Sequence, residues 1–135
     1  MKTQKAAPRP PIHMIDSEAE ALSNLALSVE DRLPDVSAML IEEISRATLH
    51  ARQAIAPDVV TMGARVEFVD EASGADRTVE IVFPREADIA TGRISILTPV
   101  GAGLIGLGTG QSIVWPDRDG HERRLTIVAV SQPRD

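Results

Sequence analysis

Apolar positions in the first half of the chain recur every three or four residues, the spacing of one face of an α-helix. The first series ends before Pro34, because proline is not accommodated in a helix interior. Ser17 and Glu20 have the spacing of a helix-capping box. We therefore predict a first helix that begins at Ser17, or at Asp16 as an alternative cap. Its apolar stripe is Ala19, Leu22, Ala26, Val29 and Leu33.

A second apolar series predicts a second helix of about 20 residues, or about 30 Å at 1.5 Å per residue, that ends at Pro57. Two helices with facing stripes and a short turn form an antiparallel helical hairpin, a short coiled coil. The alternative is that both helices lie flat on the rest of the core. The second stripe is Val36, Leu40, Ile44, Ala47, Ala51 and Ile55, and the outer face carries Glu42, Glu43, Arg46 and Arg52.

From Asp58 onward the apolar period changes to two, which is typical of β-strands. Pro99 suits the first position of a short helix that we predict to run to Leu107. Antiparallel strands with one short helix over an open face give an α+β fold. The expected strands cover 59–62, 65–69, 78–83, 93–97, 113–115 and 124–130. The expected core is Val66, Phe68, Val79, Ile81, Ile96, Leu104, Leu107, Ile113, Leu125 and Ile127.

These patterns divide the chain into a flexible tail over residues 1–13, the helical hairpin over 14–56 and a β-rich domain over 57–132.

The net charge of -6 argues against strong direct binding of nucleic acid, and it fits a basic protein partner better. The chain has no cysteine, which excludes disulfides and thiolate zinc sites and suits a reducing compartment. No segment is long enough to span a bilayer, so no membrane partner is expected.

Residues 101–106 spell G-A-G-L-I-G, a match to the dinucleotide-binding fingerprint after a predicted strand. The helix that follows is interrupted by Gly108 and Gly110, however, whereas a crossover between parallel strands needs at least about 10 residues. The alternative is that small residues let this helix pack closely on the sheet. We favour that alternative and predict no cofactor.

Glu30, Asp31 and Asp35 cluster at the predicted hairpin tip, where carboxylates suit a magnesium ion shared with a partner. The alternative is a solvated acidic turn, with Asp35 favourably placed near a helix N-terminus. His13 and His50 have no spacing typical of metal ligands, and no serine lies in a G-x-S-x-G turn. We therefore predict no catalytic residue, no resident metal and no enzymatic activity.

The segments D-V-V-T-M (residues 58–62) and S-I-L-T-P-V-G-A-G-L-I-G-L (95–107), with the upstream helical hairpin, resemble the regulator of nucleoside diphosphate kinase family. That family is related to Gre-type transcript cleavage factors, and the resemblance covers about residues 12–132. It implies an FKBP-like C-terminal domain that docks on RNA polymerase at the entrance of the secondary channel. It further implies a cytoplasmic, monomeric regulator of transcription elongation that competes with Gre-type factors. DNA binding is a further property that the resemblance implies, although no strong direct contact with nucleic acid is expected.

Thr98, Pro99, Val100 and Gly101 match the loop-to-helix position by which Gre-type factors contact a polymerase coiled coil. The resemblance makes them the predicted polymerase-binding residues. The predicted hairpin is shorter than that of the cleavage factors, and a loss of some 15 residues per helix withdraws its tip by about 20 Å. We therefore expect the tip carboxylates to fall short of the catalytic centre and not to stimulate cleavage.

The FKBP-like fold raises a prolyl isomerase as an alternative. That activity uses a pocket lined by aromatic side chains, and this chain has two phenylalanines, one tryptophan and no tyrosine. A protein-interaction or small-molecule-sensing module without polymerase binding is a further alternative. The family name implies an effect on nucleoside diphosphate kinase, reached either by direct contact with the kinase or through transcription.

Overall fold

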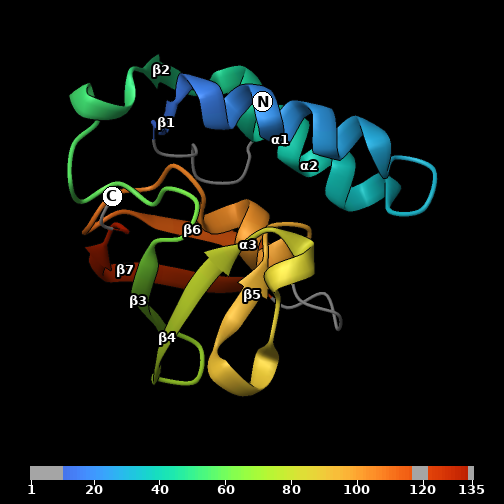
Figure 1. Ribbon diagram of the computed structural model, residues 1–135. Helices are drawn as coiled ribbons and strands as arrows, with labels where there is room; N and C mark the ends of the chain where they lie inside the picture. Colours follow the sequence, from blue (N-terminus) through green and yellow to red (C-terminus); the bar gives the residue numbers. More distant parts are fainter. Residues whose placement is uncertain (1–10, 117–121, 134–135) are drawn as a thin grey trace, which may run out of the picture.

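The computed structural model describes residues 11–116 and 122–133 and has two main layers (Figure 1). A pair of helices, α1 (Asp16–Ser28) and α2 (Pro34–Arg46), lies over a curled sheet. A third helix, α3 (Pro99–Leu104), lies between the pair and the sheet. This arrangement confirms the α+β class, whereas the FKBP-like fold and the coiled-coil character of the hairpin stay predictions.

The two long helices pack against each other through the predicted stripes. Leu22 and Ala26 of α1 and Leu40 of α2 are fully buried. Near the turn, the hydroxyl of Ser37 donates a hydrogen bond of 2.8 Å to the carbonyl oxygen of Ala26. Pro34 is in the first turn of α2, where its missing N–H costs no intrahelical hydrogen bond. The result is a short helical hairpin.

Both helices have 13 residues, about 20 Å each at 1.5 Å per residue, so the prediction of a longer second helix was wrong. The backbone becomes extended at Ala47, and β2 (Thr48–His50) then pairs in parallel with β1 (His13–Ile15). Beyond this point the apolar spacing serves other contacts, since Ile55 packs with Ile15 and Val59. The spacing of apolar residues alone could not distinguish a longer helix from a strand followed by loop contacts.

Three further expectations for this half of the chain are corrected. Ile12 was assigned to the tail, but it is 1% exposed and belongs to the main core. Neither Ser17 nor Asp16 caps α1, because the cap position is Ile15 and no side chain bonds to the helix start there. The Asp16 carboxylate accepts the adjacent Ser17 N–H, and Glu20 is exposed, so the capping box does not form. Glu43, expected on the outer face, is buried and pairs with Arg46 at 2.7 Å.

The main sheet has five strands in the order β5-β4-β3-β7-β6. Its β3, β4, β7 and β6 pair as antiparallel neighbours, but β5 runs parallel to β4, so the sheet is mixed and not purely antiparallel as expected. The bounds are β3 (Arg65–Asp70), β4 (Ala75–Val82), β5 (Arg93–Ser95), β6 (Ser112–Pro116) and β7 (Glu122–Ser131). The predicted β6–β7 turn at residues 119–120 lies outside the described residues.

The strand expected over 59–62 is absent. Val59 forms only an isolated bridge with Gly108, although Val60 exchanges backbone hydrogen bonds with Gly106 and Leu107 across the end of α3. All ten predicted core residues belong to one cluster, with Ile113 partly buried at its edge. Because this cluster also includes Leu22 and Leu40, the hairpin shares its core with the sheet layer. Within the described ranges, none of the helices has the length and apolar character needed to cross a membrane.

Candidate partner-binding groove

The turn between β5 and α3 is held by the side chain of Thr98. Its hydroxyl donates to the carbonyl oxygen of Ser95 at 2.8 Å and accepts from the N–H of Gly101 at 3.1 Å. The second contact caps the N-terminus of α3, where backbone N–H groups lack helical partners. Pro99 follows at the start of the helix and is exposed. The turn therefore has a fixed shape before any partner binds.

Gly101 is buried where α3 crosses the chain just after β5. A Cβ atom there would lie 2.5 Å from the carbonyl oxygen of Ser95 and 3.0 Å from the Cα of Ile96. Only glycine permits this approach of helix to strand. The next strand, β6, lies at the far edge of the sheet and is antiparallel to β7, so α3 is not the crossover of a dinucleotide-binding unit. The structure supports close packing as the role of the glycine-rich segment.

Thr98 and Val100 open onto a groove of about 550 Å³ beside β4 and β5. Most of its exposed lining is apolar, and Ile89, at the start of the 3-10 helix η3 (Ile89–Thr91), is 89% exposed. Such an exposed apolar side chain beside arginines is typical of a protein interface. We call this surface the edge groove. It is lined by Arg77, Thr78, Val79, Ala87, Ile89, Gly92, Arg93, Ile94, Ser95, Thr98 and Val100.

The four residues that the sequence predicted to bind a partner have different places here. Thr98 and Val100 line the edge groove, Pro99 is exposed next to it, and Gly101 is buried beneath the turn. Gly101 therefore positions the turn and offers no side chain to a partner. Sequence reasoning missed Ile89, although an isolated isoleucine within a polar loop is a signal that was available.

The acidic residues of the hairpin tip do not form a comparable site. Glu30, Asp31 and Asp35 are all exposed, and the first two border a shallow groove of about 440 Å³. Leu27, also in its lining, is 56% exposed. In the part of the chain that the structure describes, no three His, Cys, Asp or Glu residues are grouped to hold a metal ion. The tip lies at the end of the hairpin that points away from β1 and β2 (Figure 1).

The structure also brings together two histidines that sequence spacing gave no reason to pair. Nδ1 of His13 lies 2.9 Å from Nε2 of His50, a hydrogen bond in which one ring donates and the other accepts. Parallel pairing of β1 with β2 creates this contact between residues 37 positions apart. The pair therefore braces the base of the hairpin. Its origin is a tertiary contact, which residue spacing does not reveal.

Comparisons with known proteins relate the chain to transcription elongation factors and a kinase regulator. Residues 55–132 match the model of the C-terminal part of the transcription elongation factors GreA and GreB. The chain is 33% identical over 122 residues to the regulator of nucleoside diphosphate kinase of Escherichia coli, a match that covers 90% of each chain. It is 32% identical over 139 residues to the transcription elongation factor GreA of Methylobacterium nodulans, covering 97% of this chain and 87% of the relative.

The likeness extends to the arrangement of the elements. The structure of a prokaryotic transcription elongation factor GreA/GreB from Nitrosomonas europaea superposes with a TM-score of 0.73 at 35% identity. That match covers 91% of this chain and 99% of the other, so the helical hairpin is included with the sheet. The chain therefore belongs to the family that unites the GreA/GreB transcription elongation factors with the regulator of nucleoside diphosphate kinase.

Proposed function

We propose that the protein is a non-enzymatic transcription regulator that binds RNA polymerase at the entrance of the secondary channel and competes there with Gre-type factors. One observation carries this proposal. The turn at Thr98, which resembles the polymerase-contacting position of Gre-type factors, lines an exposed and largely apolar groove. A pre-shaped turn loses little conformational entropy when it docks, which favours binding.

The edge groove fits a helical partner surface with apolar side chains and acidic neighbours. Ile89, Ile94 and Val100 supply the apolar contact area. Arg77 and Arg93 are exposed at its border, where they suit carboxylates at the rim of an interface. This local positive charge contrasts with the net charge of -6 of the chain and gives the docking surface a defined orientation.

The short hairpin supports regulation by occupancy of the channel entrance and not by stimulation of transcript cleavage. Helices of about 20 Å place the tip acids closer to the channel entrance than the longer hairpin of Gre-type cleavage factors would. Glu30 and Asp31 then fall short of the catalytic magnesium, so the protein blocks the entrance without stimulating cleavage. The protein reaches DNA only as part of its complex with the polymerase, and it acts as a cytoplasmic monomer.

The effect on nucleoside diphosphate kinase follows from the name of the Escherichia coli relative. We assign it to transcription of the kinase gene, with direct contact to the kinase as the competing route. A prolyl isomerase is the competing activity for the fold. Against it, the edge groove has no aromatic side chain among its described lining residues.

The test is competition for core RNA polymerase between the purified chain and a Gre-type factor. We expect mutual displacement, and we expect the double variant Thr98→Arg, Pro99→Ala to lose it, because an arginine obstructs the groove and the helix start is loosened. Thr109→Arg, at an exposed loop position, is the matched control and should compete normally. Absence of binding at micromolar concentration would refute the polymerase assignment.

A further inference from the structure

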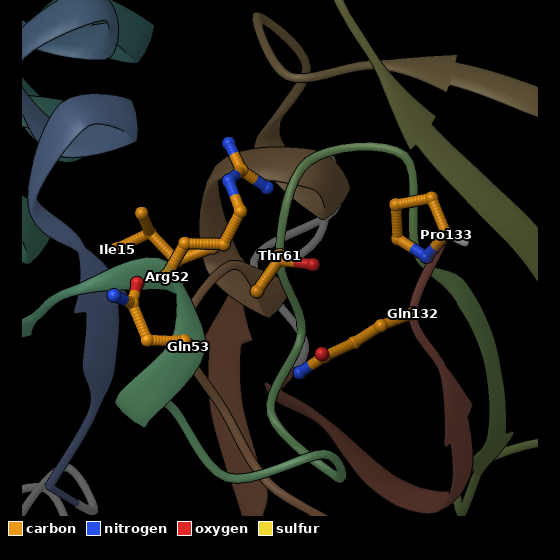
Figure 2. Close-up of a pocket in the computed structure, with 6 residues that line it drawn as sticks. All are labelled: Ile15, Arg52, Gln53, Thr61, Gln132 and Pro133. Atoms are coloured by element: carbon orange, nitrogen blue, oxygen red, sulfur yellow. The ribbon is translucent and has the colours of Figure 1, made fainter. Parts of the chain in front are cut away.

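A further pocket of about 310 Å³ lies where the base of the hairpin meets the β-rich part of the chain (Figure 2). Its walls come from β1, from the short 3-10 helix η1 (Arg52–Ala54), from the segment before β3 and from the residues that follow β7. We call it the junction pocket. It is lined by Ile15, Arg52, Gln53, Thr61, Gln132 and Pro133.

Thr61 is the most unusual member of this lining. The residue is 3% exposed, yet its hydroxyl has no hydrogen-bond partner among the residues that the structure describes. Figure 2 shows the hydroxyl oxygen on the side that faces Gln132 and Pro133. A buried polar group without a partner costs about 1–3 kcal/mol, so native proteins normally supply one. The hydroxyl is therefore available to a molecule in the pocket.

The amide of Gln132 is held in one orientation. Its Nε2 donates to the carbonyl oxygens of Ala56, at 2.8 Å, and Val59, at 2.9 Å. Both amide hydrogens are thereby used, and the oxygen Oε1 remains as an acceptor. The pocket thus combines this fixed acceptor with the donors of Thr61 and Gln53.

Arg52 supplies the positive charge. One of its terminal nitrogens lies 3.7 Å from the carboxylate of Glu18, and its side chain is 50% exposed. Glu18 is itself held by the Met62 N–H, at 3.0 Å. A half-exposed ion pair at this distance is worth no more than about 1 kcal/mol. Most of the donors of Arg52 are therefore available to a second anion.

We propose that the junction pocket binds the phosphate group of a small organic phosphate. The donors come from two separate segments, η1 and the loop at Thr61, and line the pocket from different sides. A tetrahedral phosphate directs oxygens along several axes and matches such donors, whereas a planar carboxylate is satisfied by one bidentate arginine. A volume of about 310 Å³ exceeds the needs of inorganic phosphate alone and leaves room for an organic moiety against Ile15 and Pro133.

A ligand in this place would connect the hairpin base to the β-rich part. Ile15 leads directly into α1, while Thr61 and Gln132 belong to the β-rich part. Occupancy would therefore reduce the freedom of the hairpin relative to the sheet. The proposal concerns a surface separate from the edge groove and does not depend on polymerase binding.

The test uses the full chain, with two-dimensional NMR titration against inorganic phosphate, adenosine monophosphate, glucose 6-phosphate and adenosine at constant ionic strength. We expect saturable chemical-shift changes at residues around the pocket with all three phosphates. The two organic phosphates should bind more tightly than inorganic phosphate, and adenosine should cause no such changes. Shifts that increase linearly without saturation, or equal shifts with adenosine, would overturn the proposal.

Two variants locate the site. Arg52→Gln should weaken phosphate binding by at least about tenfold, and the isosteric Thr61→Val by about fivefold. Arg32→Gln, at an exposed position of the hairpin turn, is the control and should bind like the parent. Thr61→Val also removes an unpartnered hydroxyl, so thermal unfolding without ligand should show an unchanged or higher melting temperature. Unaltered affinity in Arg52→Gln would contradict the proposal.

Discussion

The Thr98–Gly101 turn and the hairpin tip are both marked by the sequence, but the fold defines them to different degrees. The turn is fixed by two hydrogen bonds of Thr98 and by the contact of Gly101 with the backbone after β5. The tip presents exposed carboxylates on a turn whose described residues form no metal site. The difference indicates that the motif marks a structured turn, while the acidic cluster marks a solvated end.

The largest effect is expected at the contact beneath the turn. Gly101→Val should destabilise the protein by about 3 kcal/mol, because its Cβ would overlap the carbonyl oxygen of Ser95. Denaturant-induced unfolding followed by circular dichroism measures this loss. Asp31→Val at the tip is the control, with an expected change within about 0.5 kcal/mol. Equal stabilities of the two variants would remove the contrast between the regions.

The cap of α3 should give a smaller loss. Thr98→Val keeps the shape of the side chain but removes the hydroxyl, so the Gly101 N–H loses its partner. We expect a destabilisation of about 1–2 kcal/mol in the same unfolding measurement. Thr98→Ser retains the hydroxyl and should recover most of it. If serine were as destabilising as valine, the hydrogen bonds would not be what holds the turn.

Glu18 extends the comparison to a carboxylate that is not at the surface. Burial raises the pKa of Glu18 above 4.5, against the opposing effects of the Met62 N–H and Arg52. Because the folded state binds this proton more readily, the contribution of Glu18 to stability is present below pH 4.5 and is lost as pH rises through the folded pKa.

Glu18→Gln should therefore be as stable as the parent near pH 4.5 and more stable at pH 7, by at most about 1 kcal/mol. Thermal unfolding of both proteins across this pH range provides the measurement. Glu30→Gln, in the exposed tip, is the control and should change the free energy of unfolding by less than about 0.5 kcal/mol. A stabilisation of Glu18→Gln that is independent of pH would contradict this account of the buried carboxylate.

The smallest effect is expected for neutralisation of the tip. The triple variant Glu30→Gln, Asp31→Asn, Asp35→Asn should unfold within about 0.5 kcal/mol of the parent, since all three side chains are exposed. Urea denaturation tests stability, and a transcript-cleavage assay with polymerase tests function. Stimulation of cleavage by the parent that the variant loses would assign the tip a role that we do not expect.

Apolar periodicity predicted the elements that depend on local sequence. It located both helices of the hairpin and the ten core residues, because side chains on one face of an element must be buried together. It failed where a distant partner decided the structure. Thr48–His50 leaves the expected helix to pair with β1, and β5 joins β4 in parallel, and neither partner is visible in a local pattern.

The candidate sites were predictable to a different extent. Thr98 and Val100 were found through a family resemblance, and both line the edge groove. Arg77 completes that groove from β4, and the junction pocket joins four segments, so no local sequence motif indicates either of them. Such sites depend on tertiary contacts between residues that are far apart in the chain.

The most direct test compares the affinity of fluorescently labelled parent, turn variant and tip variant for core RNA polymerase in one anisotropy experiment. The account predicts that Thr98→Arg, Pro99→Ala weakens binding by at least about tenfold, as expected for a central interface position. It predicts that the triple tip variant changes the dissociation constant by less than about threefold. A turn variant that binds like the parent, beside a tip variant that does not bind, would contradict it.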